Sequence, residues 1–365
     1  MPNNPYQELD DKSFWRKAIA DRSVFDIGDL WQPKFVIQRE DPVSTYGSCF
    51  AQHIGRALSD RGFNWLISET APRHCSESLA RRYNYGVFSA RTGNIYTTSL
   101  LDQWVRWALD ESKIPHESWL KDGRYIDPFR PAMEPTGFAT MGELRKSRIQ
   151  AVRCFRKSIA DAYCFVFTLG LTESWFNAEA GYEYPMCPGT VAGEFSAQKH
   201  RFVNQNYEQV LSSLISAISN IRKINKDIKF ILTVSPVPLT ATASGKHVLV
   251  ATIHSKSTLR AVAGEMANID GSVDYFPSYE IINGPQAGGI FFEPNKRNVH
   301  PAGVEFVMNT FFKCMHGDIH SAKPRPRRIV KEQQPSPPRR EKPQKRQSSD
   351  EVCEELLLDA FGGKK

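Results

Sequence analysis

The stretch "STYGSCFAQHIGRAL" (44–58) places two candidate nucleophiles, Ser48 and Cys49, between an extended segment and an amphipathic helical pattern. A serine hydroxyl attacks a carbonyl group when a nearby base takes its proton. Cys49 is the alternative nucleophile, because a helix N-terminus lowers the pKa of a thiol. A tight turn without chemistry also selects Gly and Ser. We favour Ser48, because the residue after such a turn usually packs inward, where cysteine behaves as a small apolar side chain.

The candidate base is His300 in "RNVHPAG" (297–303), where Pro301 indicates the first turn of a helix. A neutral imidazole accepts a proton near pH 7. Ser48 follows the first expected strand and His300 precedes the last expected helix, so the two can meet above a sheet although they are far apart in sequence.

Apolar runs alternate with helical patterns, which predicts a parallel sheet covered by helices on both faces. In such sheets, ligands bind beyond the carboxyl ends of the strands, which directs attention to 169–175 and 235–240. Strands are expected at 42–47, 64–68, 163–169, 228–236 and 273–276, and helices at 50–61, 99–111, 143–162, 204–225, 250–268 and 302–315.

The composition favours one large globular domain, with 41% hydrophobic and 24% charged residues among 365. No apolar run reaches the roughly 18 residues of a membrane helix, and the polar N-terminus lacks a signal pattern. Seven cysteines without a CxxC pair argue against a disulfide framework and for a reducing compartment. We therefore expect a soluble, cytoplasmic protein.

No cofactor is expected, because the chain has neither a P-loop nor a Gly-rich dinucleotide fingerprint. The stretch "CMHGDIH" (314–320) alternates metal-type ligands but follows the last helix and runs into a polar tail. We expect no metal site there.

The net charge of +7 is concentrated near the C-terminus, where residues 319–349 carry +8 and residues 350–365 carry −3. Residues 319–349 are basic and Pro-rich, which predicts a disordered linker. Residues 350–361 predict a short amphipathic helix that folds on a protein partner, the alternative being a frayed tail. A nearly neutral folded part disfavours binding to nucleic acid or anionic lipid. The expected organisation is an N-terminal extension (1–40), an α/β domain (41–318), the linker and the terminal helix.

Further motifs are similar to those of one family. "GSCFA" (47–51) is accompanied by "YNYGVFSARTGNIYTT", "FVFTLGLTESW", "YPMCPGT", "ILTVSPVPLT" and "SKSTLRAVAGE". Over roughly 43–312 the chain resembles the GSCFA family, which looks like a branch of the SGNH (GDSL-like) hydrolases. That resemblance implies a three-layer α/β/α fold with a mainly parallel, roughly five-stranded, flavodoxin-like sheet. It also implies activity on esters, including carbohydrate O-acetyl esters.

The resemblance implies that Ser48 is the nucleophile and His300 the general base. It implies an oxyanion hole made by the amides of Ser48 and Gly86 and the hydroxyl of Thr172. Thr172 stands where the family pattern has asparagine, and Arg297 stands where it has an aspartate that orients the histidine.

The group that orients His300 therefore stays open: Asn298, Glu293, a backbone carbonyl or none. Lys256 and Arg260 lie on one helix face, where they could hold an anionic substrate group, although a solvated or ion-paired face is the more common outcome.

Four further residues are candidates for substrate binding, and three of them have a structural alternative. Glu173 is expected to bind a substrate hydroxyl or accept from a backbone N–H. Trp175 is expected to stack on a sugar or to pack in the core. His200 is expected to bind substrate or to cap the following helix. Asn298 is the fourth.

Two classes of function remain open from the sequence. The first is a serine esterase or acyltransferase that acts on O-acyl esters, with glycan esters included. The second is a binding or assembly module with weak or no catalysis, which recognises a glycan or protein and is tethered by its C-terminal tail.

Overall fold

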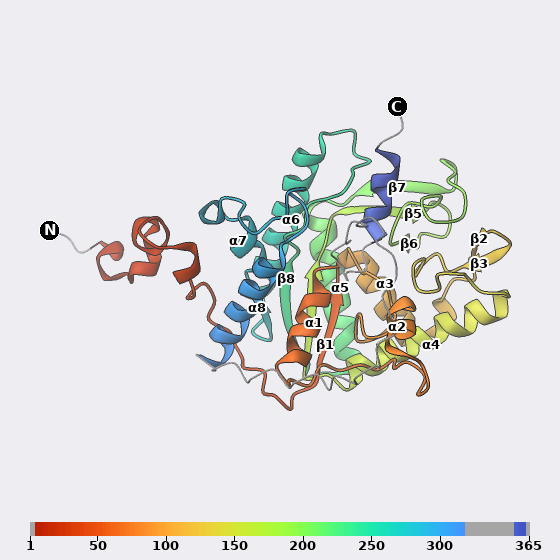
Figure 1. Cartoon of the computed structure of the whole chain (residues 1–365), viewed down its shortest axis with the longest axis horizontal. Coiled ribbons are helices and arrows are strands. Elements are labelled where there is room, and N and C mark those ends of the chain that lie inside the picture. Colours follow the sequence, from red (N-terminus) through yellow and green to blue (C-terminus); the bar gives the residue numbers. More distant parts are fainter. Residues whose placement is uncertain (1–3, 318–353, 363–365) are drawn as a thin grey trace, which may run out of the picture.

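The computed structural model describes residues 4–317 and 354–362, and its centre is a parallel sheet in the order β1-β4-β8-β9 (Figure 1). All three strand pairs are parallel. This confirms the predicted α/β class with a parallel sheet. The strands are β1 (Val43–Gly47), β4 (Cys164–Leu169), β8 (Lys229–Val234) and β9 (Val273–Tyr275).

The strand predicted at 64–68 is reduced to one parallel bridge, between Trp65 and Val43. The Val43 amide donates to the Asn64 carbonyl, and the Leu66 amide donates to the Val43 carbonyl. Pairing stops there because the Ser89 hydroxyl accepts the next free amide of this edge, that of Thr45, at 3.0 Å. The prediction of roughly five strands is therefore corrected to four strands plus one bridge among the described residues.

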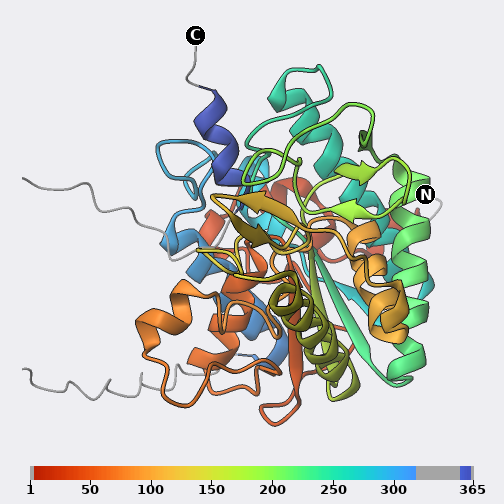
Figure 2. The same cartoon turned by 90° about the vertical axis from the view of Figure 1, so that its right-hand side faces the viewer.

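Helices cover both faces of the sheet, as the period-2 alternation of its side chains requires. Phe165 and Phe167 belong to the core cluster shared with α3, α4, α5 and α6, whereas Cys164 and Val166 belong to the cluster shared with α1, α7 and α8. Figure 2 shows the three layers from the side. The helices are α1 (Ala51–Asp60), α3 (Thr98–Leu109), α4 (Met141–Ala160), α5 (Tyr207–Ile224), α6 (Val248–Ile269), α7 (Ser278–Asn283) and α8 (Pro301–His316).

A second, antiparallel sheet lies beyond the carboxyl edge of the first, and sequence reasoning missed it. Its order is β6-β5-β7, with β5 beginning four residues after β4 ends. Short strands without a clear alternation gave little signal. The strands are β5 (Glu173–Asn177), β6 (Glu183–Tyr184) and β7 (His200–Asn204); also missed were the hairpin of β2 (Trp119–Lys121) and β3 (Arg124–Ile126), and α2 (Glu77–Arg82).

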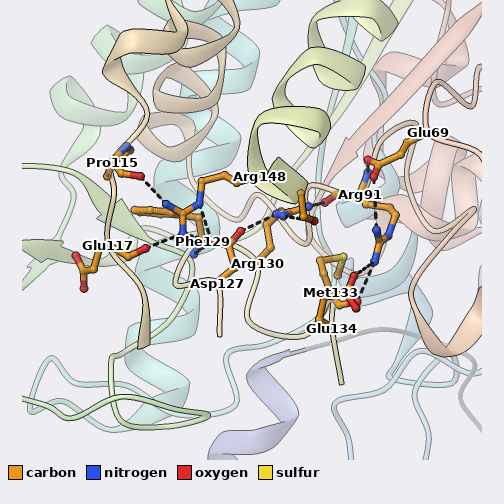
Figure 3. A network of polar contacts seen from close by, with 11 residues as sticks. Glu69, Arg91, Pro115, Glu117, Asp127, Phe129, Arg130, Met133, Glu134 and Arg148 are labelled. Atoms are coloured by element: carbon orange, nitrogen blue, oxygen red, sulfur yellow. Dashed lines mark hydrogen bonds and ion pairs between the residues drawn. The ribbon is translucent and has the colours of Figure 1, made fainter. Parts of the chain in front are cut away.

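A buried ion cluster joins α4 to the loop before it (Figure 3). Asp127 pairs with Arg130 Nε and Arg148 Nη2, each at 2.9 Å. Burial raises the pKa of Asp127, but the two guanidinium groups outweigh burial and hold that pKa below its usual value. Arg130 Nη1 also donates to the Arg91 carbonyl at 3.3 Å. The cluster thereby anchors the segment 91–96.

Arg91 extends the same network and is itself buried. Its guanidinium lies 3.5 Å from Glu69 and 2.9 Å from Glu134. Four residues further on, the Ile95 amide donates to the Gly47 carbonyl at 2.9 Å. The network therefore positions a loop directly against the end of β1.

Glu183 in β6 is a buried carboxylate that accepts hydrogen bonds from the hydroxyls of Thr97 and Ser99. Burial raises the pKa of Glu183 to about 7, although both hydroxyls act in the opposite direction. Between the unfolded value of 4.5 and about 7, the folded chain binds more protons, so this group's contribution to stability falls as pH rises through that window.

We expect Glu183→Gln to flatten the fall in the free energy of unfolding between pH 5 and pH 8, because glutamine does not titrate. Urea denaturation of both chains at the two pH values measures this difference. Equal pH dependence of the two chains would contradict the assignment.

The N-terminal segment forms short helical turns and then packs against the domain (Figure 1). Trp31 is buried, with ring centroids 5.1 Å from Phe276 and 5.3 Å from Phe311. Residues 27–37 of the predicted extension thus contribute to the core. The turns are η1 (Pro5–Glu8), η2 (Asp11–Ser13), η3 (Arg16–Ala20) and η4 (Val24–Asp26).

Two predictions concern the remaining parts of the chain. The linker predicted at 319–349 lies outside the described residues. No helix within 4–317 or 354–362 combines the length and apolar character that a membrane span needs. The cytoplasmic location stays a prediction.

Candidate functional site

Ser48 is held at the carboxyl end of β1 by a turn that only glycine permits before it. Gly47 has φ +133°, and a Cβ there would lie 2.3 Å from the Thr168 carbonyl oxygen. Parallel pairing places Gly47 beside Thr168 in β4. When the parallel bridge at Trp65 is counted beside β1, the order across the sheet is Trp65-β1-β4-β8-β9. The direction of the chain order then reverses between β1 and β4, which is the usual ligand position of such sheets.

The Ser48 hydroxyl is buried and makes no hydrogen bond to any residue that the structure describes. Leaving a buried hydroxyl unbonded costs about 1–3 kcal/mol, so such groups indicate a role other than stability. Ser44 and Thr168 also have unbonded buried hydroxyls. Ser48 differs from them because it lines a cavity.

That cavity, called here the Ser48 cavity, holds about 10 Å³, close to the space of one water molecule. Gly170 leaves little room beside it, because a Cβ there would lie 3.1 Å from Ser48 Cβ. Its lining residues come from the ends of β1, β4 and β8, from α6 and from the anchored loop: Ser48, Cys49, Tyr96, Gly170, Leu171, Ser235, Val237, Leu239 and Lys256.

Lys256 supplies the positive charge among the described lining residues of the Ser48 cavity. It is only 2% exposed, and its ammonium donates to the Gly170 carbonyl at 2.6 Å. The expectation of a solvated helix face is therefore wrong for Lys256. The expectation of an ion-paired face holds for Arg260, which pairs with Glu280.

Cys49 is buried, lines the same cavity and belongs to the core cluster of α1 and α8. This packing agrees with the expectation that the residue after the turn points inward. Its role as the alternative nucleophile stays a prediction.

The three groups expected in the oxyanion hole are not assembled around Ser48. The Ser48 amide donates to the Thr168 carbonyl at 3.0 Å, and the Thr172 hydroxyl donates to Asn204 Oδ1 at 2.6 Å. Gly86 is exposed and does not line the Ser48 cavity. At the carboxyl end of β1, Ile95 rather than Gly86 supplies the backbone contact to Gly47.

His300 is the N-cap of α8, at the predicted helix start, and its side chain is exposed. Its Nδ1 accepts from the Ala302 amide at 3.2 Å. His300 does not line the Ser48 cavity. The backbones of Asn298 and Glu293 form hydrogen bonds with neighbouring residues of the same loop, and not with the imidazole ring of His300. A neutral imidazole with Nδ1 as acceptor carries its proton on Nε2, so His300 must release the Ala302 amide and carry its proton on Nδ1 instead before Nε2 can act as a base.

A larger cavity of about 770 Å³, called here the apolar cavity, adjoins the Ser48 cavity. Leu171 and Leu239 line both. Glu173 and Trp175, two of the predicted substrate-binding residues, lie in its wall.

Glu173 and Trp175 have different contacts in the wall of the apolar cavity. Glu173 accepts from the Ala243 amide at 3.1 Å and from the Thr242 hydroxyl, which confirms the backbone-acceptor expectation, while its role in substrate binding stays a prediction. Trp175 is half-buried and meets Phe195 edge-on at 5.5 Å.

His200 and Asn298 lie outside both cavities. His200 is not a helix cap, because Asn206 caps α5; its Nδ1 accepts from the Ser196 amide at 3.1 Å. Burial lowers the pKa of His200.

Sequence reasoning did not single out Tyr96 at the Ser48 cavity, because no motif of its own marks this residue. Ser235 lies in the strand-end segment 235–240, and Lys256 was considered only as a holder of an anionic substrate group. Within the part of the chain that the structure describes, no three His, Cys, Asp or Glu side chains gather as metal ligands.

The fold and this cavity define an α/β protein with a serine at the topological switch point of a parallel sheet. The chain belongs to the GSCFA family, whose family model matches residues 42–311. The searches of curated proteins and of solved structures both find no match.

Proposed function

We propose that the protein is a serine-dependent esterase or acyltransferase that acts on O-acyl esters, glycan O-acetyl esters included. The observation that carries this proposal is the buried Ser48 hydroxyl, unbonded among the described residues and facing a cavity that Lys256 also lines. The resemblance to SGNH hydrolases supports the same chemistry.

In the proposed reaction, Ser48 Oγ bonds to the ester carbonyl carbon while its proton passes to a base. The tetrahedral intermediate collapses, the C–O bond to the leaving alcohol breaks, and the alcohol takes that proton. Water then attacks the acyl-serine to give an acid, or a second hydroxyl attacks it to give a new ester. His300 is the proposed base, once its Nδ1 leaves the Ala302 amide.

Lys256 is proposed to stabilise the oxyanion in place of the donors that are engaged elsewhere. A buried ammonium stabilises developing negative charge strongly, because it acts in a water-poor site. Its bond to the Gly170 carbonyl holds it at the Ser48 cavity.

We expect Lys256→Met to reduce kcat about 100-fold with little change in KM, because the lost group acts mainly on the transition state. Arg260→Met is the matched control, one turn along the same helix and paired with Glu280. Steady-state kinetics of both variants measure the effect. A change in KM alone would contradict the oxyanion role.

The proposal is tested by offering the full chain a series of p-nitrophenyl esters from acetate to octanoate, and O-acetylated sugars with and without an added alcohol acceptor. We expect release of p-nitrophenol or acetate above the uncatalysed rate. Absence of turnover on the whole series would count against the enzyme.

A binding module is the second candidate, favoured by the engaged oxyanion donors and by the position of His300 outside the Ser48 cavity. Trp175 and Glu173 in the apolar cavity then serve recognition of a glycan or protein. Binding of an O-acetylated glycan array without turnover would favour this candidate.

A further inference from the structure

The apolar cavity is walled partly by the carboxyl-terminal end of the chain itself. Most of its described lining comes from the loops after β6 and β8 and from the start of β5. The wall is completed by Leu358 and Phe361 of η7 (Glu354–Phe361). The segment η7 is the dark-blue helix near the C-terminus in Figures 1 and 2.

The spacing of the two side chains suits this position. Residues three apart lie on the same side of a 3-10 helix, so Leu358 and Phe361 face the cavity together. Asp359 and Ala360, which lie between them, are exposed. The amphipathic pattern of this segment thus has an apolar partner within the same chain.

We propose that residues 354–361 cover the apolar cavity in cis, seated by Leu358 and Phe361. The cavity offers the matching surface, with Trp175, Met186 and Phe195 in its wall. Sequence reasoning expected this segment to fold on a protein partner, and the proposal gives it the apolar cavity of its own chain as partner.

The length of chain before η7 permits this arrangement. Residues 318–353 connect α8 to η7, and 36 residues reach up to about 120 Å when extended. A domain of this size is roughly 50 Å wide. A tethered segment has an effective concentration on the order of mM, so even a weak contact is populated.

We expect the contact between η7 and the apolar cavity to be reversible. Phe361 remains 59% exposed and Leu358 is half-buried, so only part of their apolar surface leaves water. A hydrophobic group that enters the cavity more deeply would displace the segment. The idea that this displacement opens the cavity to a substrate rests on the proposed function, whereas the cover itself does not.

The test uses the full chain with Ser48→Ala, so that no hydrolysis intervenes. Hydrogen exchange is followed by mass spectrometry in peptides that contain 171–195 and 237–243. Phe361→Asp is expected to speed exchange there, because a carboxylate will not enter the apolar cavity. Ala360→Asp adds the same charge at an exposed position and is expected to leave exchange unchanged. Equal exchange in the two variants would overturn the proposal.

Dilution separates a cover in cis from a contact with a second copy. Protection of these peptides is expected to be the same over a hundredfold range of concentration, with a monomer in sedimentation. Protection that appears only at high concentration, together with a dimer, would overturn the cis arrangement.

The ester series separates this proposal from the proposed function. With Ser48 intact, Phe361→Asp is expected to raise kcat/KM for octanoate more than for acetate. If no variant hydrolyses any ester while Phe361→Asp still speeds exchange, the cover stands and the enzyme fails. If exchange does not respond, the cover fails whatever the activity.

Discussion

Ser48→Ala is expected to lower kcat for ester hydrolysis at least about 10³-fold, because it removes the atom that bonds to the carbonyl carbon. The substitution deletes one oxygen that has no hydrogen-bond partner among the described residues, so the fold should be retained. Initial rates with p-nitrophenyl acetate, alongside an unfolding curve, measure both quantities.

Two matched variants sharpen this prediction. Ser44 lies on β1, the strand that leads to Ser48, is buried, and also has a hydroxyl without a hydrogen bond among the described residues, but it does not line the Ser48 cavity. Ser44→Ala should therefore hydrolyse the ester at close to the wild-type rate. Cys49→Ala should retain most activity; a loss equal to that of Ser48→Ala would favour the thiol as nucleophile.

Asp127→Asn is expected to lower the free energy of unfolding by about 3–5 kcal/mol, the usual cost of removing one partner from a buried ion pair. The side chains of Arg130 and Arg148 are at most 1% exposed, so their charges would stay buried without their carboxylate. Urea denaturation measures the change. Because the cluster anchors residues 91–96, ester hydrolysis should fall as well.

An exposed ion pair supplies the control for Asp127. Glu111 binds Arg153 at 2.7 Å, but both side chains remain at least 43% exposed. Glu111→Gln should change stability by less than about 1 kcal/mol, because surface pairs contribute little. Equal effects of the two substitutions would contradict the structural role of the buried cluster.

The central sheet was predictable because its strands are apolar on both faces and bounded by helices. Residues 164–169 in β4 are entirely buried, which is why the run "CFVFTL" is continuous in the sequence. The starts predicted at 143 and 204 for the two long helices lie two and three residues from the observed starts of α4 and α5, where Thr140 with Glu143 and Asn206 with Gln209 form capping boxes. The turn at Gly47 and Ser48 was predicted because it separates an extended segment from an amphipathic helical pattern.

The remaining features depend on tertiary contacts that have no local pattern. Gly86 was matched to an oxyanion donor by its motif, but the loop position is set by Arg130 holding the Arg91 carbonyl. Lys256 looked like one charge on a helix face, and only the packing of α6 over the end of β4 places it beside Ser48. The strand at Trp65 was shortened by a side-chain hydroxyl from Ser89.

The site of covalent modification by a fluorophosphonate tests the central claim most directly, because the reagent reports which atom attacks. After reaction of the full chain and proteolysis, peptide mass spectrometry locates the adduct. We predict the adduct on Ser48, with none formed in Ser48→Ala. An adduct on another residue, or equal labelling of the Ser48→Ala chain, would contradict the assignment of Ser48 as the nucleophile.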